Sequence, residues 1–336
     1  MPDDPGSSSL TITQAAAAYL DSVALARSPN TARTYQNGMA AFLKCLADTG
    51  LDPKTNDLSA LREDTITWFA MGLKGFAPTT ERLYLTAATG FFEYLAGENL
   101  RQVNLARIRL LIRQRARRPG VRLPQFPADA IDKIIQEITT TRSFEGVEVD
   151  EKLRILRDRA FLLTLCDTGL RVHEACGLRR GDLDWNTGQA LIIGKGNRQD
   201  IVRFSRRCQA ALKDYLAARS AIDGAGGKAL AALPLFARHD KGAGKKIKPI
   251  TTTTGRNIVN EAVRSILGEE AVGTITPHSF RHYFVTRVLR SSHNLKLAQE
   301  LARHRNIAVT QRYAHLSNDE LDKGYYDAIE EDNSAS

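Results

Sequence analysis

A histidine and an arginine lie three residues apart at a point where a helix is expected to begin. The segment Thr276–Arg281 opens with a capping threonine and a proline, and His278 and Arg281 share one helix face. The positive end of the helix dipole favours an anion there, and an arginine can bind a phosphate through two donors. The spacing therefore predicts an anion site. Taken alone, the pair would more simply be a solvated surface feature.

A second arginine opens another expected helix. Arg171 follows the Thr168-Gly169 turn that ends a long amphipathic helix, and Glu174 lies three residues further on. Taken alone, Arg171 and Glu174 would form a surface ion pair that stabilises the protein little. Their position at a helix start nevertheless makes Arg171 a second candidate for anion binding.

Three further residues are of types that move protons or attack electrophiles. Lys195 lies between two glycines at the expected tip of a hairpin, where a lysine is usually solvated but can donate a proton to a leaving oxygen. His304 ends one expected helix, and Tyr313 lies nine residues later on the next. A lone tyrosine in such a place is most often a residue at the edge of the core.

The elements that would position these residues are mostly helical. Residues 10–100 contain four expected helices, which indicates a compact helical domain. After residue 123, helices alternate with three short β runs joined by glycine turns, which predicts a small antiparallel meander. The fold class is therefore mainly α with a small antiparallel sheet. The expected helices are 11–26, 29–48, 60–73, 78–96, 128–138, 151–167, 206–222, 254–267, 277–291, 295–303 and 307–314, and the expected strands are 181–184, 189–193 and 200–204.

The net charge of +9 favours a polyanionic partner, and its distribution is uneven. Residues 1–100 hold fewer basic than acidic residues, so a surface for such a partner there would need one basic helix face that the sequence does not identify. Residues 101–122 hold eight arginines and no acidic residue, and they end in Pro119-Gly120, which favours a linker over a core element. Without an acidic neighbour to pair with, the arginines are expected to bind an external anion. The candidates are Arg107, Arg109, Arg113, Arg115, Arg117, Arg118 and Arg122, with Lys245 and Lys246 in the loop 223–248.

Metal, disulfide and membrane functions find no support in the sequence. The four cysteines form no C-x-x-C pair with nearby histidines, which argues against zinc and against a disulfide framework. No run approaches the length of a membrane span, and neither a carboxylate cluster for a two-metal site nor a Walker-type loop is visible. The sequence thus predicts a cytoplasmic, nucleoid-associated protein with no cofactor.

Taken together, the order Arg, Lys, His-x-x-Arg, His, Tyr resembles the tyrosine recombinase (phage integrase) family. Residues 10–100, including Ser28-Pro29-Asn30-Thr31-Ala32, resemble its helical core-binding domain, and residues 123–317 resemble its catalytic domain. The linker would be 101–122, with a flexible lead at 1–9 and an acidic tail at 318–336. The resemblance implies a C-shaped clamp closed on DNA.

The resemblance also implies roles for the residues named above. Arg171 and Arg281 would clamp the scissile phosphate, and Lys195 would be the general acid to the 5′ oxygen. His278 would assist proton transfer, and His304 would hydrogen-bond the phosphate. Tyr313 would attack phosphorus to form a 3′-phosphotyrosine. Glu174 would orient His278 or Arg171.

The implied reaction cuts and rejoins DNA strands without metal or ATP. Four protomers would assemble on two core sites of double-stranded DNA and pass through a Holliday junction, with the tail docking on a neighbour or fraying as a soluble end. Either a mobile-element integrase or a host Xer-like resolvase fits, and an accessory protein is possible in both. The alternatives are a non-catalytic DNA-binding protein of the same fold and a type IB topoisomerase-like relaxase.

Two features depart from the family pattern or compete with it. Arg303 stands where the family commonly has a small residue, usually glycine, before the second histidine. Tyr325 and Tyr326 are rival nucleophiles in the tail. His173, His282 and His315 are expected to pack or to be solvated.

Overall fold

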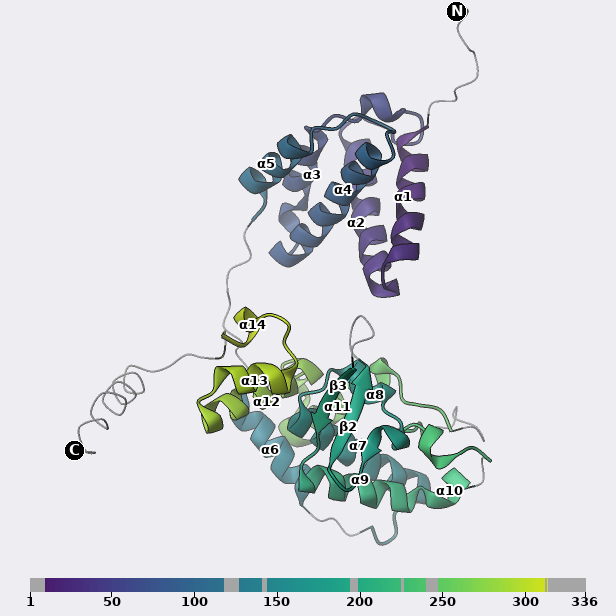
Figure 1. Ribbon diagram of the computed structural model, residues 1–336, viewed down its shortest axis with the longest axis vertical. Coiled ribbons are helices and arrows are strands. Elements are labelled where there is room, and N and C mark those ends of the chain that lie inside the picture. Colours follow the sequence, from purple (N-terminus) through teal and green to yellow (C-terminus); the bar gives the residue numbers. More distant parts are fainter. Residues whose placement is uncertain are drawn as a thin grey trace, which may run out of the picture. The chain divides into compact units, whose positions relative to one another are not determined.

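The computed structural model describes residues 10–117, 127–140, 144–193, 199–224, 227–239, 247–311 and 313. The chain divides into two compact units, residues 1–121 and 122–336 (Figure 1). Both units are mainly helical, and the second contains one small antiparallel sheet, so the predicted fold class is confirmed. Within the described residues, no helix is long and apolar enough to cross a membrane.

The first unit is a bundle built around aromatic side chains. Phe42 packs edge-on against Phe69, Phe91 and Phe92, with ring centroids 5.2–6.4 Å apart. Side-chain caps at Thr11 and Ser28 begin the first two helices, and Pro78 begins α4. The α-helices are α1 (Ile12–Ala26), α2 (Pro29–Asp48), α3 (Thr65–Gly72), α4 (Pro78–Gly97) and α5 (Leu105–Arg115), with 3₁₀ turns at Leu58–Ala60 and Leu73–Gly75.

Helix α5 corrects the prediction of a four-helix domain followed by a linker at 101–122. Asn104 caps the helix by accepting from the Arg107 N–H, and Ile108 is fully buried in the core of the first unit. Leu105, Leu111 and neighbouring apolar residues pack against that core. An arginine-rich segment can still be part of a core because its apolar stripe is buried while the charged ends of its side chains reach solvent.

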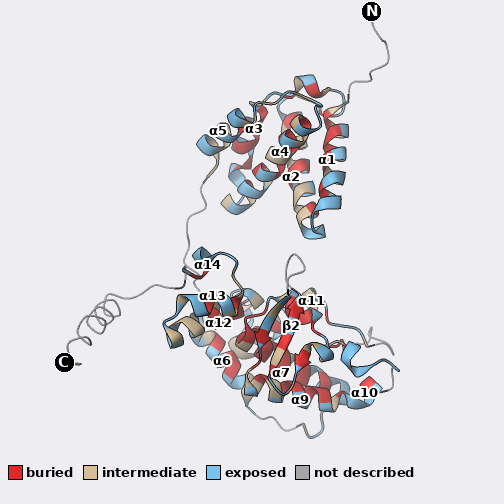
Figure 2. Cartoon of the chain, in the orientation of Figure 1, coloured by how far each residue is buried: buried red, intermediate tan, exposed pale blue. Residues whose placement is uncertain are grey.

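The second unit is organised around α7, which is buried continuously from Ala160 to Cys166 and again at Thr168 (Figure 2). The sheet has the order β1-β2-β3, with Leu183 opposite Ala190 and Leu191 opposite Ile201. The α-helices are α6 (Ala128–Thr139), α7 (Val149–Thr168), α8 (Val172–Gly177), α9 (Arg206–Ala218), α10 (Ser220–Gly224), α11 (Thr252–Leu267), α12 (Pro277–Ser292), α13 (Leu295–Ala302) and α14 (Ile307–Gln311). The strands are β1 (Leu183–Asp184), β2 (Gln189–Ile193) and β3 (Gln199–Arg203), and 3₁₀ turns lie at Arg180–Asp182, Leu230–Ala232 and Glu269–Ala271.

Three predicted elements differ in extent. The helix expected over 206–222 is divided at Arg219 into α9 and α10, and the strand expected from Gly181 is a 3₁₀ turn before a two-residue β1. Helix α14 ends at Gln311, so Tyr313 lies in the following turn, with its N–H donating to the Thr310 carbonyl at 2.9 Å. The backbone of Tyr313 is therefore held by a turn hydrogen bond and not by the hydrogen bonds of a continuing helix.

Gly169 determines how the chain leaves α7. Its φ of +60° places it in the left-handed region, and a Cβ there would lie 2.4 Å from the ring of Phe284 on α12. Only glycine combines that conformation with so close an approach. The turn brings Arg171, two residues later, to the start of α8 beside α12.

Candidate active site

Arg281 joins two turns that are far apart in sequence. Its side chain emerges from the first turns of α12, where Thr276 and Ser279 form a capping box, and the residue is 2% exposed. Its Nη1 donates to the carbonyl oxygen of Gly169 at 2.5 Å, and its Nη2 donates to the carbonyl oxygen of Ala302. One guanidinium therefore holds the turn after α7 against the turn after α13.

The electrostatic environment of Arg281 is strongly positive. Burial lowers its pKa to about 9, and the neighbouring charges of Arg171 and Arg303 act in the same direction. Guanidinium groups that repel one another at short range create a site in which an anion relieves the repulsion.

Arg171 is held by both its backbone and its side chain. Its N–H donates to Oε2 of Glu174 at 2.8 Å, and its Nη1 donates to Oε1 at 2.8 Å. Burial raises the pKa of Glu174, but the hydrogen bonds from Arg171 and the charge of Arg303 outweigh it, so that pKa is lowered. Glu174 thus fixes Arg171, which is one of the two alternatives that the sequence left open. The Arg171 side chain remains 43% exposed, which leaves donors available to a ligand.

Arg303 occupies the turn after α13 in an unusual conformation. It caps the helix with φ 57° and ψ 43°, in the left-handed region that favours glycine. Its side chain is 6% exposed, and Nη2 contacts Oε2 of Glu174 at 3.1 Å. Its Nε and Nη1 have no hydrogen-bond partner among the described residues. In the sequence, Arg303 stood out only as a departure from a family pattern.

One histidine of α12 contacts Tyr313, and a second histidine packs against the first. The ring centroids of His278 and His282 are 4.3 Å apart, and Nδ1 of His282 contacts the hydroxyl of Tyr313. His282 was expected to pack or to be solvated, so its contact with Tyr313 corrects that prediction. The four-residue spacing from His278 was the available signal, because it places both rings on the same helix face.

His304 follows, by two residues, the Ala302 carbonyl that accepts from Arg281. Its Nδ1 lies 2.9 Å from Oγ1 of Thr310, and the amide of Gln299 donates to its carbonyl at 3.0 Å. Burial and then the charges of Arg281 and Arg171 lower its pKa to about 4. Burial, His278 and Arg281 likewise lower the pKa of His282 to about 4, and burial lowers the pKa of His278. These imidazoles are therefore neutral near pH 7 and can accept a proton or donate an N–H.

Several predicted site residues fall outside the part of the chain that the structure describes. They are Lys195, Arg118, Arg122, Lys245 and Lys246, together with His315 and the rival tyrosines Tyr325 and Tyr326. The strands on either side of Lys195 are described, and Ile193 pairs with Gln199 across β2 and β3. No group of three or more potential metal ligands occurs among the described residues.

The arginines of the 101–117 segment have partners within their own unit. Arg107 pairs with Asp64 at 2.8 Å, Arg109 pairs with Glu93 at 2.8 Å, and Arg117 pairs with Glu81 at 2.6 Å. The expectation of an external anion rested on the lack of acidic residues nearby in the sequence, but Arg107, Arg109 and Arg117 pair with carboxylates at the start of α3 and on α4. Arg115 bonds Gln114 at 3.0 Å.

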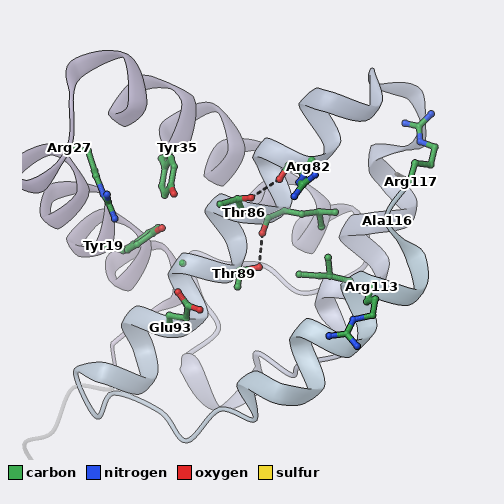
Figure 3. A pocket seen from close by; sticks show the side chains of 13 residues that line it. Tyr19, Arg27, Tyr35, Arg82, Thr86, Thr89, Glu93, Arg113, Ala116 and Arg117 are labelled. Atoms are coloured by element: carbon green, nitrogen blue, oxygen red, sulfur yellow. Dashed lines mark hydrogen bonds between the residues drawn. The ribbon is translucent and has the colours of Figure 1, made fainter. Parts of the chain in front are cut away.

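The first unit also contains a basic cavity (Figure 3). It has a volume of about 800 Å³, and its lining includes Arg27, Arg82 and Arg113 together with Tyr19 and Tyr35. These arginines come from the end of α1, from α4 and from α5, so the positive charge is assembled by folding rather than by one helix face. The cavity identifies a positive surface on a unit whose first hundred residues are acidic overall.

Comparison with known proteins identifies similar sequences and folds. The model of the phage integrase family matches residues 126–320. The chain is 31% identical to the tyrosine recombinase XerC of Thermodesulfovibrio yellowstonii over 247 residues, which cover 73% of each chain. It is 28% identical to XerD of Brucella melitensis over 88% of this chain and 89% of that protein. The solved structure of XerH bound to a palindromic difH substrate, a post-cleavage complex, matches with a TM-score of 0.66 at 18% identity, over 94% of this chain and 84% of that one.

Proposed function

This chain belongs to the phage integrase family of tyrosine recombinases, and from that membership we propose how its residues cut and rejoin DNA. Members of the family are DNA strand-exchange enzymes, and the chain is a site-specific recombinase. The observation that carries the proposal is the contact between the Tyr313 hydroxyl and His282, in the same unit as the Arg171–Glu174 pair and the Arg281 bridge.

Arg171 and Arg281 bind the scissile phosphate. Arg171 has a half-exposed side chain with donors available to a ligand. Arg281 supplies a second guanidinium, and burial and the neighbouring arginines lower the pKa of this group. A phosphodiester carries one negative charge and gains more in the pentavalent transition state. Fixed guanidinium groups therefore stabilise the transition state more than the ground state. His304, whose pKa is lowered to about 4, adds a neutral imidazole that hydrogen-bonds the phosphate.

Tyr313 is the nucleophile. Its oxygen forms a bond to phosphorus as the bond to the 5′ oxygen breaks, which leaves a 3′-phosphotyrosine and a free 5′-hydroxyl. The tyrosine proton passes to His282, which is neutral near pH 7, and His278 supports the transfer from the adjacent turn. Lys195 donates the proton that the 5′ oxygen requires. A 5′-hydroxyl from another strand then attacks the phosphotyrosine, and the proton transfers run in reverse.

Double-stranded DNA is the partner. The related XerH was solved bound to its difH site, which supports a duplex ligand. On the first unit, the cavity lined by Arg27, Arg82 and Arg113 contributes phosphate contacts, and Arg107 and Arg109 supply further charge beside their carboxylate partners. Arg118, Arg122, Lys245 and Lys246 remain proposed contacts from the sequence.

Strand exchange requires four protomers on two core sites, joined through a Holliday junction. The acidic tail, 318–336, docks on a neighbouring protomer. Deleting it should impair recombination and leave single-site binding largely intact, whereas loss of single-site binding would refute the docking role. Both a mobile-element integrase and a host resolvase fit this scheme.

Covalent capture tests the enzymatic role. The full chain is incubated with a pool of nicked duplexes whose central sequence is randomised, and complexes that survive denaturing electrophoresis are recovered. Wild type should form a covalent complex, and Tyr313→Phe should bind the same duplexes without forming one. Absence of the complex in wild type, or its persistence in Tyr313→Phe, would overturn the assignment.

A second measurement separates recombination from simple relaxation. The captured sequence is placed twice in a supercoiled plasmid, and the products are resolved. Exchange between the paired sites should exceed relaxation of a plasmid with one site. Relaxation without exchange would favour the topoisomerase-like alternative.

A further inference from the structure

Arg303 combines three costly features. It adopts a left-handed backbone conformation, it buries a charged side chain to 6% exposure, and it leaves Nε and Nη1 without hydrogen-bond partners among the described residues. A glycine would remove all three costs. The strained backbone and the buried charge persist together only if the side chain contributes something that glycine cannot.

The contribution is visible at Glu174. That carboxylate receives the backbone N–H of Arg171 on Oε2 and the Arg171 guanidinium on Oε1, and Arg303 reaches Oε2 from the opposite turn at 3.1 Å. Glu174 is 3% exposed, so these groups replace the water that would otherwise solvate it. With two hydrogen bonds from Arg171 and one from Arg303, the carboxylate cannot rotate without breaking a charged hydrogen bond.

The contact also changes the charge available to a ligand. If Glu174 paired with Arg171 alone, one carboxylate would neutralise one guanidinium. Because Arg303 shares the carboxylate, the cluster of Arg171, Arg303 and Glu174 retains a net positive charge, to which Arg281 adds another. Arg303 follows Ala302 directly, and the carbonyl of Ala302 accepts from Arg281. The turn after α13 is therefore bonded both to Arg281 and, through Arg303, to Glu174.

We propose that Arg303 is a positioning residue for strand cleavage, which holds Glu174 so that Arg171 is fixed and still positively charged toward the phosphate. The inference rests on the proposed function. It concerns a residue that acts through Glu174, and it requires no contact between Arg303 and DNA.

The test uses glycine, which fits the backbone but lacks the side chain. Arg303→Gly should fold with an unchanged or higher melting temperature and should bind a single duplex site normally. Its rate of covalent-complex formation at saturating DNA should fall roughly 10- to 100-fold, because Arg171 loses its orientation. Arg303→Lys should retain part of the rate. The matched control is His293→Gly, because His293 has φ 49° at the end of α12 and is exposed.

A double-mutant cycle identifies the route. Glu174→Gln should reduce the cleavage rate strongly in wild type but much less in Arg303→Gly, since the two residues act through one contact. Guanidinium chloride at low millimolar concentration should partly restore Arg303→Gly, and sodium chloride at the same concentration should not. A wild-type rate in Arg303→Gly, or additive effects in the cycle, would overturn the inference. A wild type that forms no covalent complex would instead overturn the proposed function, and this inference with it.

Discussion

The hydroxyl of Tyr313 contacts Nδ1 of His282, an imidazole one helical turn beyond His278 on α12. The ring of His278 meets the ring of His282 edge to face, with centroids 4.3 Å apart, so both imidazoles lie within one turn of the helix that faces Tyr313. The turn after α14 brings Tyr313 to His282, and α12 supplies both imidazoles.

His282 is expected to accept the tyrosine proton directly. His282→Asn should lower the rate of covalent-complex formation by roughly 10²- to 10⁴-fold, a range typical of the loss of a general base. DNA affinity should stay constant, because no phosphate-binding group is removed. Single-turnover cleavage and equilibrium binding measure the two quantities. His278→Asn serves as the comparison, and a larger loss in that variant than in His282→Asn would assign the main role to His278.

Arg281 should not tolerate lysine. A single ammonium cannot donate to the carbonyls of Gly169 and Ala302 with the planar geometry of a guanidinium and also face a phosphate. We expect Arg281→Lys to reduce cleavage about 100-fold, the effect of a small misplacement of reacting groups. Hydrogen exchange at the turns around Gly169 and Ala302 should rise in parallel. Unchanged exchange with normal cleavage would contradict the bridging role.

Stability of the second unit should fall as the pH is lowered from about 6.5 to about 4. The pKa values of His282 and His304 are about 4 in the folded chain, against 6.5 for an ordinary histidine. Within that window the unfolded chain binds protons that the folded chain does not, so acid favours unfolding. Urea titrations of Trp68→Phe, in which Trp185 is the remaining tryptophan and lies against the core of the second unit, report this transition.

A variant with both His282 and His304 replaced by glutamine provides the control for this pH dependence. Its decline in stability between these pH values should be shallower. An equal slope in both proteins would show that other groups control the titration.

Glu81 should anchor the end of α5 to the first unit. Its side chain is fully buried and accepts from Lys74 at 2.9 Å and from the backbone N–H of Arg117 at 2.9 Å, in addition to the Arg117 side chain. Burial raises the pKa of Glu81, but these bonds prevail and lower it to about 2. Glu81→Gln should cost about 1–3 kcal/mol in urea unfolding near pH 7, because charged hydrogen bonds are removed inside the protein.

The exposed Glu93–Arg109 pair provides the control for Glu81. Glu93→Gln should cost about 0–1 kcal/mol, since both partners are hydrated. The contribution of ionised Glu81 is present above about pH 4.5 and is lost as the pH falls toward 2, because its folded pKa is the lower one. Equal costs for both substitutions would refute an anchoring role.

The basic cavity should contribute to DNA affinity by neutralising phosphates. Arg82→Ala and Arg113→Ala should each weaken binding to all sequences alike and reduce the slope of log K against log salt by about 0.9 for each phosphate that is no longer neutralised. Fluorescence anisotropy at several salt concentrations measures the slope. Lys54→Ala is the matched control, because Lys54 is exposed in the same unit and does not line the cavity. An unchanged slope in both arginine variants would remove the cavity from the interface.

Sequence patterns predicted the elements well wherever the signal was local. Strand β2 matches the predicted range 189–193, and α2, α4 and α12 begin at the prolines that predicted their starts. Helix α5 was missed because its arginines were judged against their sequence neighbours. The carboxylates that pair with Arg107, Arg109 and Arg117 lie at the start of α3 and on α4, 43, 16 and 36 residues away.

The candidate site was predicted in composition but not in its connections. The types and order of Arg171, His278, Arg281, His304 and Tyr313 were available from the sequence, whereas the contacts among them depend on tertiary structure. Periodicity shows that His282 shares a face with His278, but it cannot show that Tyr313 arrives from a later turn. The Arg303 side chain reaches Glu174 across 129 residues of sequence, a contact that no local pattern indicates.

The Arg281 bridge has a consequence for how the protein is made. Arg281 bonds Gly169, 112 residues earlier, and Ala302, 21 residues later. A ribosome therefore delivers Arg171 and Glu174 long before the guanidinium that secures their turn, and it delivers Tyr313 later still. A translation product that stops before α12 lacks both Arg281 and Tyr313, the proposed nucleophile. Under the proposed mechanism, the order of synthesis is itself a safeguard, because an incomplete chain without Tyr313 has no nucleophile with which to break DNA.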